Sequence, residues 1–139
     1  MAKNPDRGAE SKRISAQLFL RIHAETIDVD LSFVKKALEI VDDDEPQFAF
    51  SDDDVDITTL DFLNEPKLSG DDGQRQWQRA FRNAEKWFLK RTPDQFDVIR
   101  KAGLCADLCV VDYTGLFPSG LLSQALRLRM DFWVFSLGS

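Results

Sequence analysis

Residues 74–91, QRQWQRAFRNAEKWFLKR, hold the clearest helical pattern in the chain, and the other segments can be arranged around them. Apolar side chains recur there at steps of three and four residues, so at about 100° per residue they share one broad sector of a helix. These apolar positions are Trp77, Ala80, Phe81, Ala84, Trp87 and Phe88. The opposite sector carries five bases, namely Arg75, Arg79, Arg82, Lys86 and Lys90. The pattern predicts an amphipathic helix with its aromatic face on the core and its basic face in solvent.

The residues after this helix predict a second, shorter one. Thr92 is a suitable N-cap. Pro93 suits the first helical position, because a backbone N–H at that position would have no intrahelical acceptor and its absence costs nothing. Gly103 marks the end of this helix over residues 93–101, because glycine readily adopts the left-handed conformation that often follows a helix.

Two strands and one further helix complete the C-terminal part. Residues 104–113, LCADLCVVDY, carry so little polarity that they predict a largely buried strand. Ser119 or Ser123 is a candidate N-cap for a helix that ends near Arg129. Residues 131–137, DFWVFSL, are rich in aromatic and β-branched side chains and predict the last strand.

The N-terminal part begins with a strand. Residues 14–25, ISAQLFLRIHAE, alternate with a period of two, which predicts a strand with one strongly apolar face. Asp28 or Asp30 can cap a helix over residues 31–40.

The segment between the two amphipathic helices is less regular. Residues 42–45, DDDE, and Pro46 favour a helix end, since carboxylates are unfavourable at the negative end of the helix dipole. Residues 48–50 suggest a short strand, and residues 57–63 fit either a strand or a helical turn. Residues 66–73 predict a loop that contains two glycines.

Helices and strands thus mix without strict βαβ alternation. We expect an α+β fold with a single antiparallel or mixed sheet and helices packed on one face. The 139 residues suit one domain over residues 14–139, with an acidic insert around residues 42–72. Residues 1–13 have charges at both ends and no apolar centre, so we expect a disordered tail rather than a secretory signal. No apolar run approaches the roughly 20 residues of a membrane helix, so we expect no membrane partner.

The net charge of −6 is distributed unevenly along the chain. Residues 28–72 hold fifteen acidic and three basic residues, a net charge of −12, whereas the remainder of the chain carries +6. A dense acidic surface repels nucleic acid and attracts basic proteins. We therefore expect no nucleic-acid partner. The acidic region is interpreted either as a docking surface for a basic protein, as a solvated loop, or as a partner for the basic sector of residues 74–91.

The candidate partner-binding residues lie in two acidic clusters and the segment between them. Phe48 and Phe50 are candidate aromatic anchors, because acidic charge contributes more to the rate of association than to affinity. A short buried strand is the other interpretation of these two residues. The acidic candidates are Asp42, Asp43, Asp44, Glu45, Asp52, Asp53, Asp54 and Asp56.

The second acidic cluster also has the spacing of calcium ligands. Asp52, Asp54 and Asp56 match positions 1, 3 and 5 of an EF-hand loop. Ile57 stands where that loop needs glycine, and Leu63 stands where it needs a bidentate glutamate. We therefore expect neither a metal ion nor another cofactor.

Catalytic motifs are scarce in this sequence. His23 is the only histidine, which excludes a multi-histidine metal site, and no nucleophile elbow, P-loop or dinucleotide fingerprint occurs. A Cys–His nucleophile pair needs His23 beside Cys105 or Cys109 on a neighbouring strand, and the alternative is that both cysteines simply pack. On a strand, the two cysteines lie about 13 Å apart on one face, too far for a disulfide. Reduced thiols suit the cytoplasm, and we expect no catalytic residues and no enzymatic activity.

Two stretches resemble the DUF4279 domains, a family of small bacterial domains. The first is residues 18–38, LFLRIHAETIDVDLSFVKKAL, which resembles the opening strand, polar turn and helix of that family. The second is residues 96–135, where a helix, a glycine and a strand are followed by Pro118-Ser119-Gly120, a helix and an aromatic strand. Together they cover about half of the chain. The family has no established catalytic residues, and its members are similar in size and context to immunity proteins, so the resemblance implies binding rather than catalysis.

The charge distribution and the resemblance lead to one expected function and two alternatives. We expect a cytoplasmic immunity protein that binds and neutralises a cognate basic toxin domain. The first alternative is a small enzyme or ligand-binding domain with a pocket between sheet and helices, lined by His23 or Asp107. The second is a homodimer formed through residues 131–137. The sequence leaves the choice between monomer and homodimer open.

Overall fold

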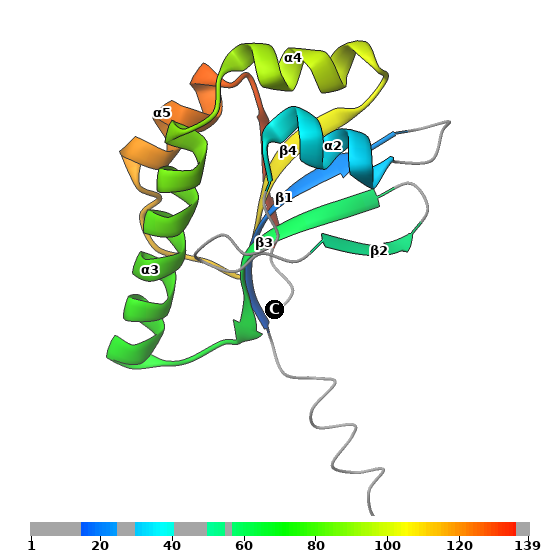
Figure 1. Ribbon diagram of the computed structural model, residues 1–139. Helices are drawn as coiled ribbons and strands as arrows, with labels where there is room; N and C mark the ends of the chain where they lie inside the picture. The colour runs from blue at the N-terminus through cyan, green and yellow to red at the C-terminus, as the bar shows by residue number, and fades with distance from the viewer. Residues whose placement is uncertain (1–14, 25–29, 41–49, 55–56, 136–139) are drawn as a thin grey trace, which may run out of the picture.

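The structure is a computed structural model that describes residues 15–24, 30–40, 50–54 and 57–135 (Figure 1). Its strands are β1 (Ser15–His23), β2 (Phe50–Asp54), β3 (Ile57–Pro66), β4 (Cys105–Val111) and β5 (Asp131–Phe135). Its helices are α2 (Leu31–Leu38), α3 (Gly70–Leu89), α4 (Pro93–Lys101) and α5 (Ser119–Arg127). The expected disordered tail at residues 1–13 lies outside the described residues.

The strands form one mixed sheet in the order β2-β3-β1-β4-β5. The first strand of the chain is central and runs antiparallel to both of its neighbours, β3 and β4. The outer strand β5 runs parallel to β4, whereas β2 runs antiparallel to β3. The expected α+β fold with a single mixed sheet is confirmed.

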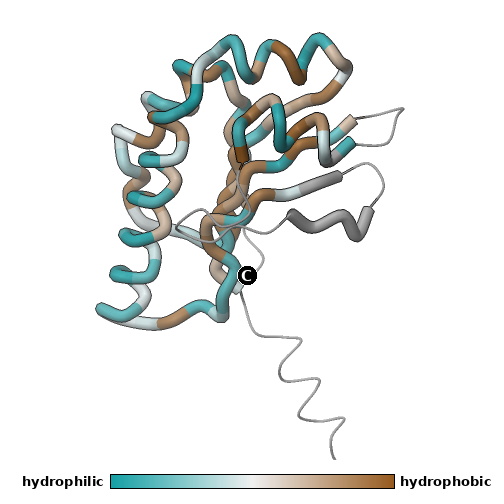
Figure 2. Tube along the Cα trace, viewed as in Figure 1, coloured by the Kyte–Doolittle hydropathy of each residue, from teal (hydrophilic) through white to brown (hydrophobic). Residues whose placement is uncertain are grey.

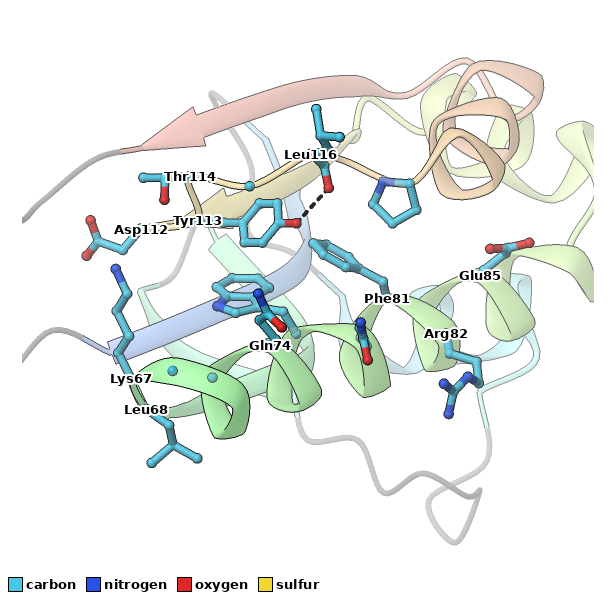
Figure 3. Close-up of a pocket in the computed structure, with 16 residues that line it drawn as sticks. Lys67, Leu68, Gln74, Phe81, Arg82, Glu85, Asp112, Tyr113, Thr114 and Leu116 are labelled. Carbon is cyan, nitrogen blue, oxygen red and sulfur yellow. Dashed lines mark hydrogen bonds between the residues drawn. The ribbon is translucent and has the colours of Figure 1, made fainter.

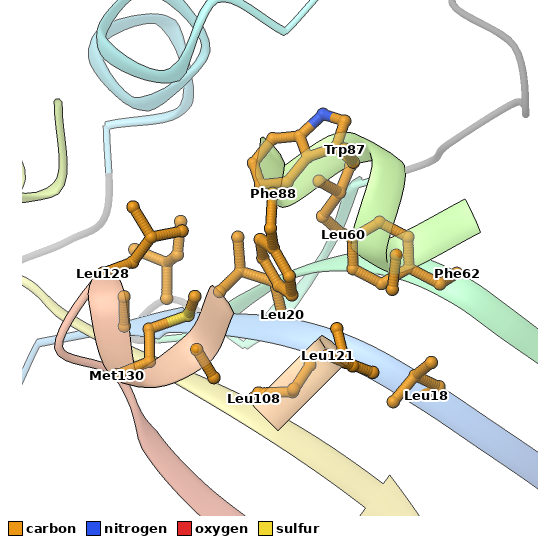
Figure 4. Close-up of a cluster of buried hydrophobic side chains, with 14 of the residues drawn as sticks. Leu18, Leu20, Leu60, Phe62, Trp87, Phe88, Leu108, Leu121, Leu128 and Met130 are labelled. Carbon is orange, nitrogen blue, oxygen red and sulfur yellow. The ribbon is translucent and has the colours of Figure 1, made fainter. Parts of the chain in front are cut away.

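The helices cover one face of this sheet, as expected. Alternate residues of β1 are fully buried, among them Leu18, Leu20 and Ile22, and they belong to one apolar cluster with residues of every helix. The aromatic sector of α3 supplies the largest share of that cluster, and the ring of its fully buried Phe88 points toward Leu20 of β1 (Figure 4). Figure 2 shows hydrophobic residues gathered along the middle strands, while hydrophilic positions recur along α3.

The predicted helix caps explain where two helices begin. The Asp30 side chain accepts a hydrogen bond from the Phe33 backbone N–H at 3.2 Å, which fixes the start of α2. Thr92 and Gln95 form a reciprocal capping box at the start of α4, with Pro93 at its first position. Gly103, which follows α4, has a φ of +92°, in agreement with its expected role at the helix end.

Several predicted boundaries are wrong. The helix expected over residues 74–91 begins at Gly70, so the expected loop over residues 66–73 is partly helical. Asp71 and Asp72 stabilise that first turn by lying near the positive end of the helix dipole. The ambiguous residues 57–63 belong to a strand, because β3 follows the full length of β1. The N-cap of α5 is Pro118, rather than Ser119 or Ser123, and this helix ends at Arg127.

Within the described ranges, no helix has both the length and the apolar character that would let it cross a bilayer.

Candidate functional site

The acidic candidates lie partly in the described residues. Asp42, Asp43, Asp44, Glu45, Phe48 and Asp56 fall outside them. Phe50, Asp52, Asp53 and Asp54 belong to β2, which shares only Phe50 with the short strand expected over residues 48–50 and lies mainly on the second acidic cluster.

The strand β2 is the outermost strand of the sheet on its side. It pairs with β3 through Phe50 opposite Leu60, Ser51 opposite Thr59 and Asp54 opposite Ile57. In the described sheet β3 is its one hydrogen-bonded neighbour. The second acidic cluster therefore lies on a sheet edge, where a strand of another protein can add by backbone hydrogen bonds.

The basic sector of α3 is exposed and lies away from this edge. Arg75 and Asp72, both on α3, form an exposed ion pair at 2.9 Å. Arg79, Arg82, Lys86 and Lys90 lie on the helix side that faces away from the core, as expected. Figure 1 shows α3 and β2 on opposite sides of the molecule. The aspartates of β2 are therefore separated in space from the basic sector of α3.

A pocket of about 780 Å³ opens between α3 and the segment 112–118 that follows β4 (Figure 3). Its apolar wall consists of aromatic rings in mutual contact. The Tyr113 ring lies 4.8 Å from the ring of Trp77 and 5.0 Å from that of Phe81. Trp77 and Phe81 are buried, and their rings are 5.4 Å apart. The pocket thus has a preformed aromatic floor of the kind that small-molecule sites use.

Tyr113 also holds the loop that borders this pocket. Its hydroxyl donates a hydrogen bond of 2.6 Å to the Leu116 carbonyl oxygen, as Figure 3 shows. Burial raises the pKa of Tyr113, because the surrounding protein disfavours the charged phenolate. Gly115 packs under the same ring, and a Cβ added there would come within 2.6 Å of the Tyr113 oxygen. The loop is therefore closely fitted around the phenol.

Polar groups of both signs line the rim of the pocket. Lys67 and Asp112 lie at one end, and Arg82 and Glu85 lie on α3 toward the other end (Figure 3). Leu116 projects almost fully into solvent, with 94% of its surface exposed. This site was not predicted from the sequence, because its members come from two segments with no shared local pattern. The one sequence feature that indicates a site here is the loop at residues 112–118, because loops that directly follow a buried strand often carry functional residues.

The sheet face opposite the helices carries a separate polar cluster. Asp107 on β4 accepts hydrogen bonds on the same oxygen, Oδ2, from Arg21 Nη2 at 2.8 Å and from His23 Nε2 at 2.9 Å. Asp107 is buried, whereas the side chains of Arg21 and His23 are 23% and 27% exposed. The Arg21 guanidinium also lies 5.7 Å from the ring centre of Trp133 on β5. Because His23 and Asp107 lie on the face opposite the helices, they cannot line a pocket between sheet and helices as expected, and the lining of the 780 Å³ pocket contains neither of them.

The two cysteines lie on this same face, as expected, but in different surroundings. Cys105 is exposed and lies directly opposite His23 in the β1–β4 pairing. Cys109 is buried opposite Phe19, and burial raises its pKa to about 11. Both thiols are free. The structure therefore places His23 beside Cys105, the adjacency that a nucleophile pair needs, and it does not place His23 beside Cys109.

In the parts of the chain that the structure describes, no three His, Cys, Asp or Glu side chains are arranged to hold a metal ion. The described chemistry is thus an acidic sheet edge, an aromatic pocket and a Cys–His–Asp–Arg cluster. Comparisons with protein-family models, with curated proteins and with solved structures found no match to this chain.

Proposed function

We propose that this protein is a cytoplasmic immunity protein that binds a cognate basic toxin domain through its acidic region, with β2 as part of the contact surface. The position of Asp52, Asp53 and Asp54 on an outer strand is the observation that carries the proposal. The resemblance of residues 18–38 and 96–135 to the DUF4279 domains supports it.

Two physical features of an acidic edge strand favour this role. Its outward backbone N–H and C=O groups can pair with a strand of the toxin, which supplies affinity. Its carboxylates attract Lys and Arg on the toxin, accelerate the encounter and exclude acidic partners. β2 and α3 lie on opposite sides of the molecule (Figure 1), so this strand does not lie beside the basic sector of that helix.

A charge-matched pair of variants tests the proposal. The double variant Asp52→Asn/Asp53→Asn is compared with Asp71→Asn/Asp72→Asn, which removes the same charge from an exposed helix start. We expect only the β2 variant to weaken binding of the toxin encoded by the adjacent gene and to reduce the salt dependence of binding measured by calorimetry. Equal effects of both variants would show that overall charge, rather than β2, matters. Unchanged binding in both variants would refute the docking role.

Ligand binding in the aromatic pocket is a second candidate function. The volume of about 780 Å³ and the floor of Trp77, Phe81 and Tyr113 favour it, because small-molecule sites are concave and largely apolar with few polar groups. A screen of small planar compounds by NMR tests it. We expect bound compounds to shift the amide signals of residues 112–118 and to lose affinity in Tyr113→Ala, with Trp133→Ala on the opposite sheet face as the control. Binding that is insensitive to Tyr113→Ala would exclude this pocket.

A further inference from the structure

We propose that Cys105, with His23 as its base and Asp107 as the positioning residue, is a site of reversible modification by small disulfides. This inference concerns the sheet face opposite the helices and is independent of the proposed toxin binding.

The register of β1 and β4 brings the three side chains together. His23 is directly opposite Cys105, and Arg21 is directly opposite Asp107, two residues further along β4. Directly opposed residues of an antiparallel pair project to the same face with Cβ atoms about 5 Å apart. A rotation about the Cys105 side chain therefore brings its sulfur within reach of the His23 ring, directly or through one water.

Asp107 fixes the orientation and the tautomer of His23. The hydrogen bond of 2.9 Å from His23 Nε2 to Asp107 Oδ2 places a proton on Nε2 and leaves Nδ1 as the basic nitrogen. Arg21 holds the same carboxylate oxygen at 2.8 Å, so Asp107 is anchored from β1. A base with a fixed orientation beside a thiol is the arrangement that activates a cysteine nucleophile.

The exposure of the two thiols makes the reaction selective. Cys105 is open to a small disulfide in solvent. Cys109 is fully buried, and its raised pKa of about 11 keeps it in the unreactive thiol form near neutral pH. The chain therefore contains its own matched control, a second cysteine on the same strand and the same face without a histidine opposite.

The reaction is a thiol–disulfide exchange with balanced atoms and electrons. His23 Nδ1 accepts the proton of the Cys105 thiol, and the thiolate attacks one sulfur of the small disulfide. The sulfur–sulfur bond of the reagent breaks, a mixed disulfide forms at Cys105, and the leaving thiolate receives the proton from His23. The disulfide is the oxidant, and excess small thiol reverses the step.

Dithiodipyridine, a neutral aromatic disulfide whose released thione is coloured, tests the site on the full chain. We expect one rapid equivalent per chain, located at Cys105 by mass spectrometry and retained in Cys109→Ala. We also expect folded Cys109→Ala to react faster than the same variant unfolded in urea, where Cys105 has no neighbouring base. A rapid equivalent at Cys109, or a folded rate at or below the unfolded rate, would overturn the proposal.

Variants of His23 distinguish a role as the base in the reaction of Cys105 from a role in stabilising the fold. His23→Gln can keep a hydrogen bond to Asp107 but has no basic nitrogen, so we expect it to remain folded by circular dichroism and to react about tenfold more slowly. Added imidazole should restore part of the rate in His23→Ala and leave the rate of the parent unchanged. Asp107→Asn, which retains an acceptor for His23, should react at an intermediate rate. A folded His23→Gln variant that reacts as fast as the parent would refute the role of His23.

Discussion

Arg21 and Asp107 face each other across the two central strands of the sheet and form an ion pair of 2.8 Å on the face that carries no helix. The pair is asymmetric, because 6% of the Asp107 side chain is exposed against 23% of the Arg21 side chain. The Asp107 carboxylate therefore relies on Arg21 and His23, rather than on solvent, as its hydrogen-bond donors. These contacts between β1 and β4 favour the observed register of the two strands.

Asp107→Ala should lower the free energy of unfolding by about 3 kcal/mol, because it leaves the Arg21 charge without its partner in a partly buried position. Asp72→Ala, which removes an ion pair whose members are 67% and 74% exposed, should change it by less than about 1 kcal/mol. Urea denaturation of the two variants measures both values. Equal losses would contradict the importance of the buried pair.

Removal of the α4 cap should affect two helices to different extents. Thr92→Ala should lower the free energy of unfolding by about 1 kcal/mol, whereas Thr92→Ser keeps the hydroxyl and should stay close to the parent. Gln95→Ala should also loosen α2, since the Gln95 amide donates to the Ala37 carbonyl at 3.2 Å and to Glu39 at 2.7 Å. Amide hydrogen exchange in α2 should therefore accelerate in Gln95→Ala and much less in Thr92→Ala. Equal hydrogen-exchange rates of the α2 amides in the two variants would mean that Gln95 acts only as a cap of α4.

The single tyrosine gives a direct optical test of the pocket wall. The pKa of Tyr113 is raised by burial, so the absorbance change of tyrosinate should occur at higher pH in the folded protein than in urea. The neutral phenol is the form favoured in the folded state. Its contribution to stability is therefore complete below the unfolded pKa of about 10 and is lost as the pH rises through the folded pKa. Tyr113→Phe should abolish the optical transition, and identical transitions in water and urea would contradict the burial.

Neighbouring residues of α3 should differ sharply in their contribution to stability. Phe88→Ala should lower the free energy of unfolding by about 3–5 kcal/mol, because Phe88 is fully buried against Phe62 and Trp87. Leu89→Ala removes a side chain that is 57% exposed and should change it by about 0.5 kcal/mol or less. Thermal unfolding followed by circular dichroism distinguishes the two. A small effect of Phe88→Ala would contradict its place in the core.

This contrast also shows what local sequence patterns determine. The aromatic sector of residues 74–91 repeats at helical spacing, so its buried face can be predicted from the sequence alone. The caps at Asp30 and Thr92 and the fold class are equally accessible, because each depends on neighbouring residues or on the order of elements.

The candidate sites depend on residues that are distant along the chain. The pocket joins α3 to the segment 112–118, and the polar cluster joins His23 to Asp107 across 84 positions. No period or spacing encodes such pairs, because strand order and register are set by the packing of the whole sheet. From the sequence, either Cys105 or Cys109 could lie beside His23. The register of β1 and β4 places Cys105 opposite His23 and Cys109 opposite Phe19.

Gly73 is the position where a local rule and the tertiary structure give opposite expectations. Alanine is favoured over glycine inside a helix by about 1 kcal/mol, so propensity alone predicts that Gly73→Ala stabilises α3. A Cβ at this position would clash with the Leu68 carbonyl oxygen, a backbone atom in the turn that precedes the helix. We expect Gly73→Ala to lower the free energy of unfolding by about 1 kcal/mol or more, because overpacking moves the backbone. Gly120→Ala is the matched control in α5, since the atoms nearest to its Cβ would be those of the Glu85 carboxylate, the end of a flexible side chain that can move aside. Urea denaturation should give Gly120→Ala a free energy of unfolding equal to or above that of the parent, and Gly73→Ala a lower one. The reverse order would mean that the turn before α3 can move to accommodate the Cβ at little cost.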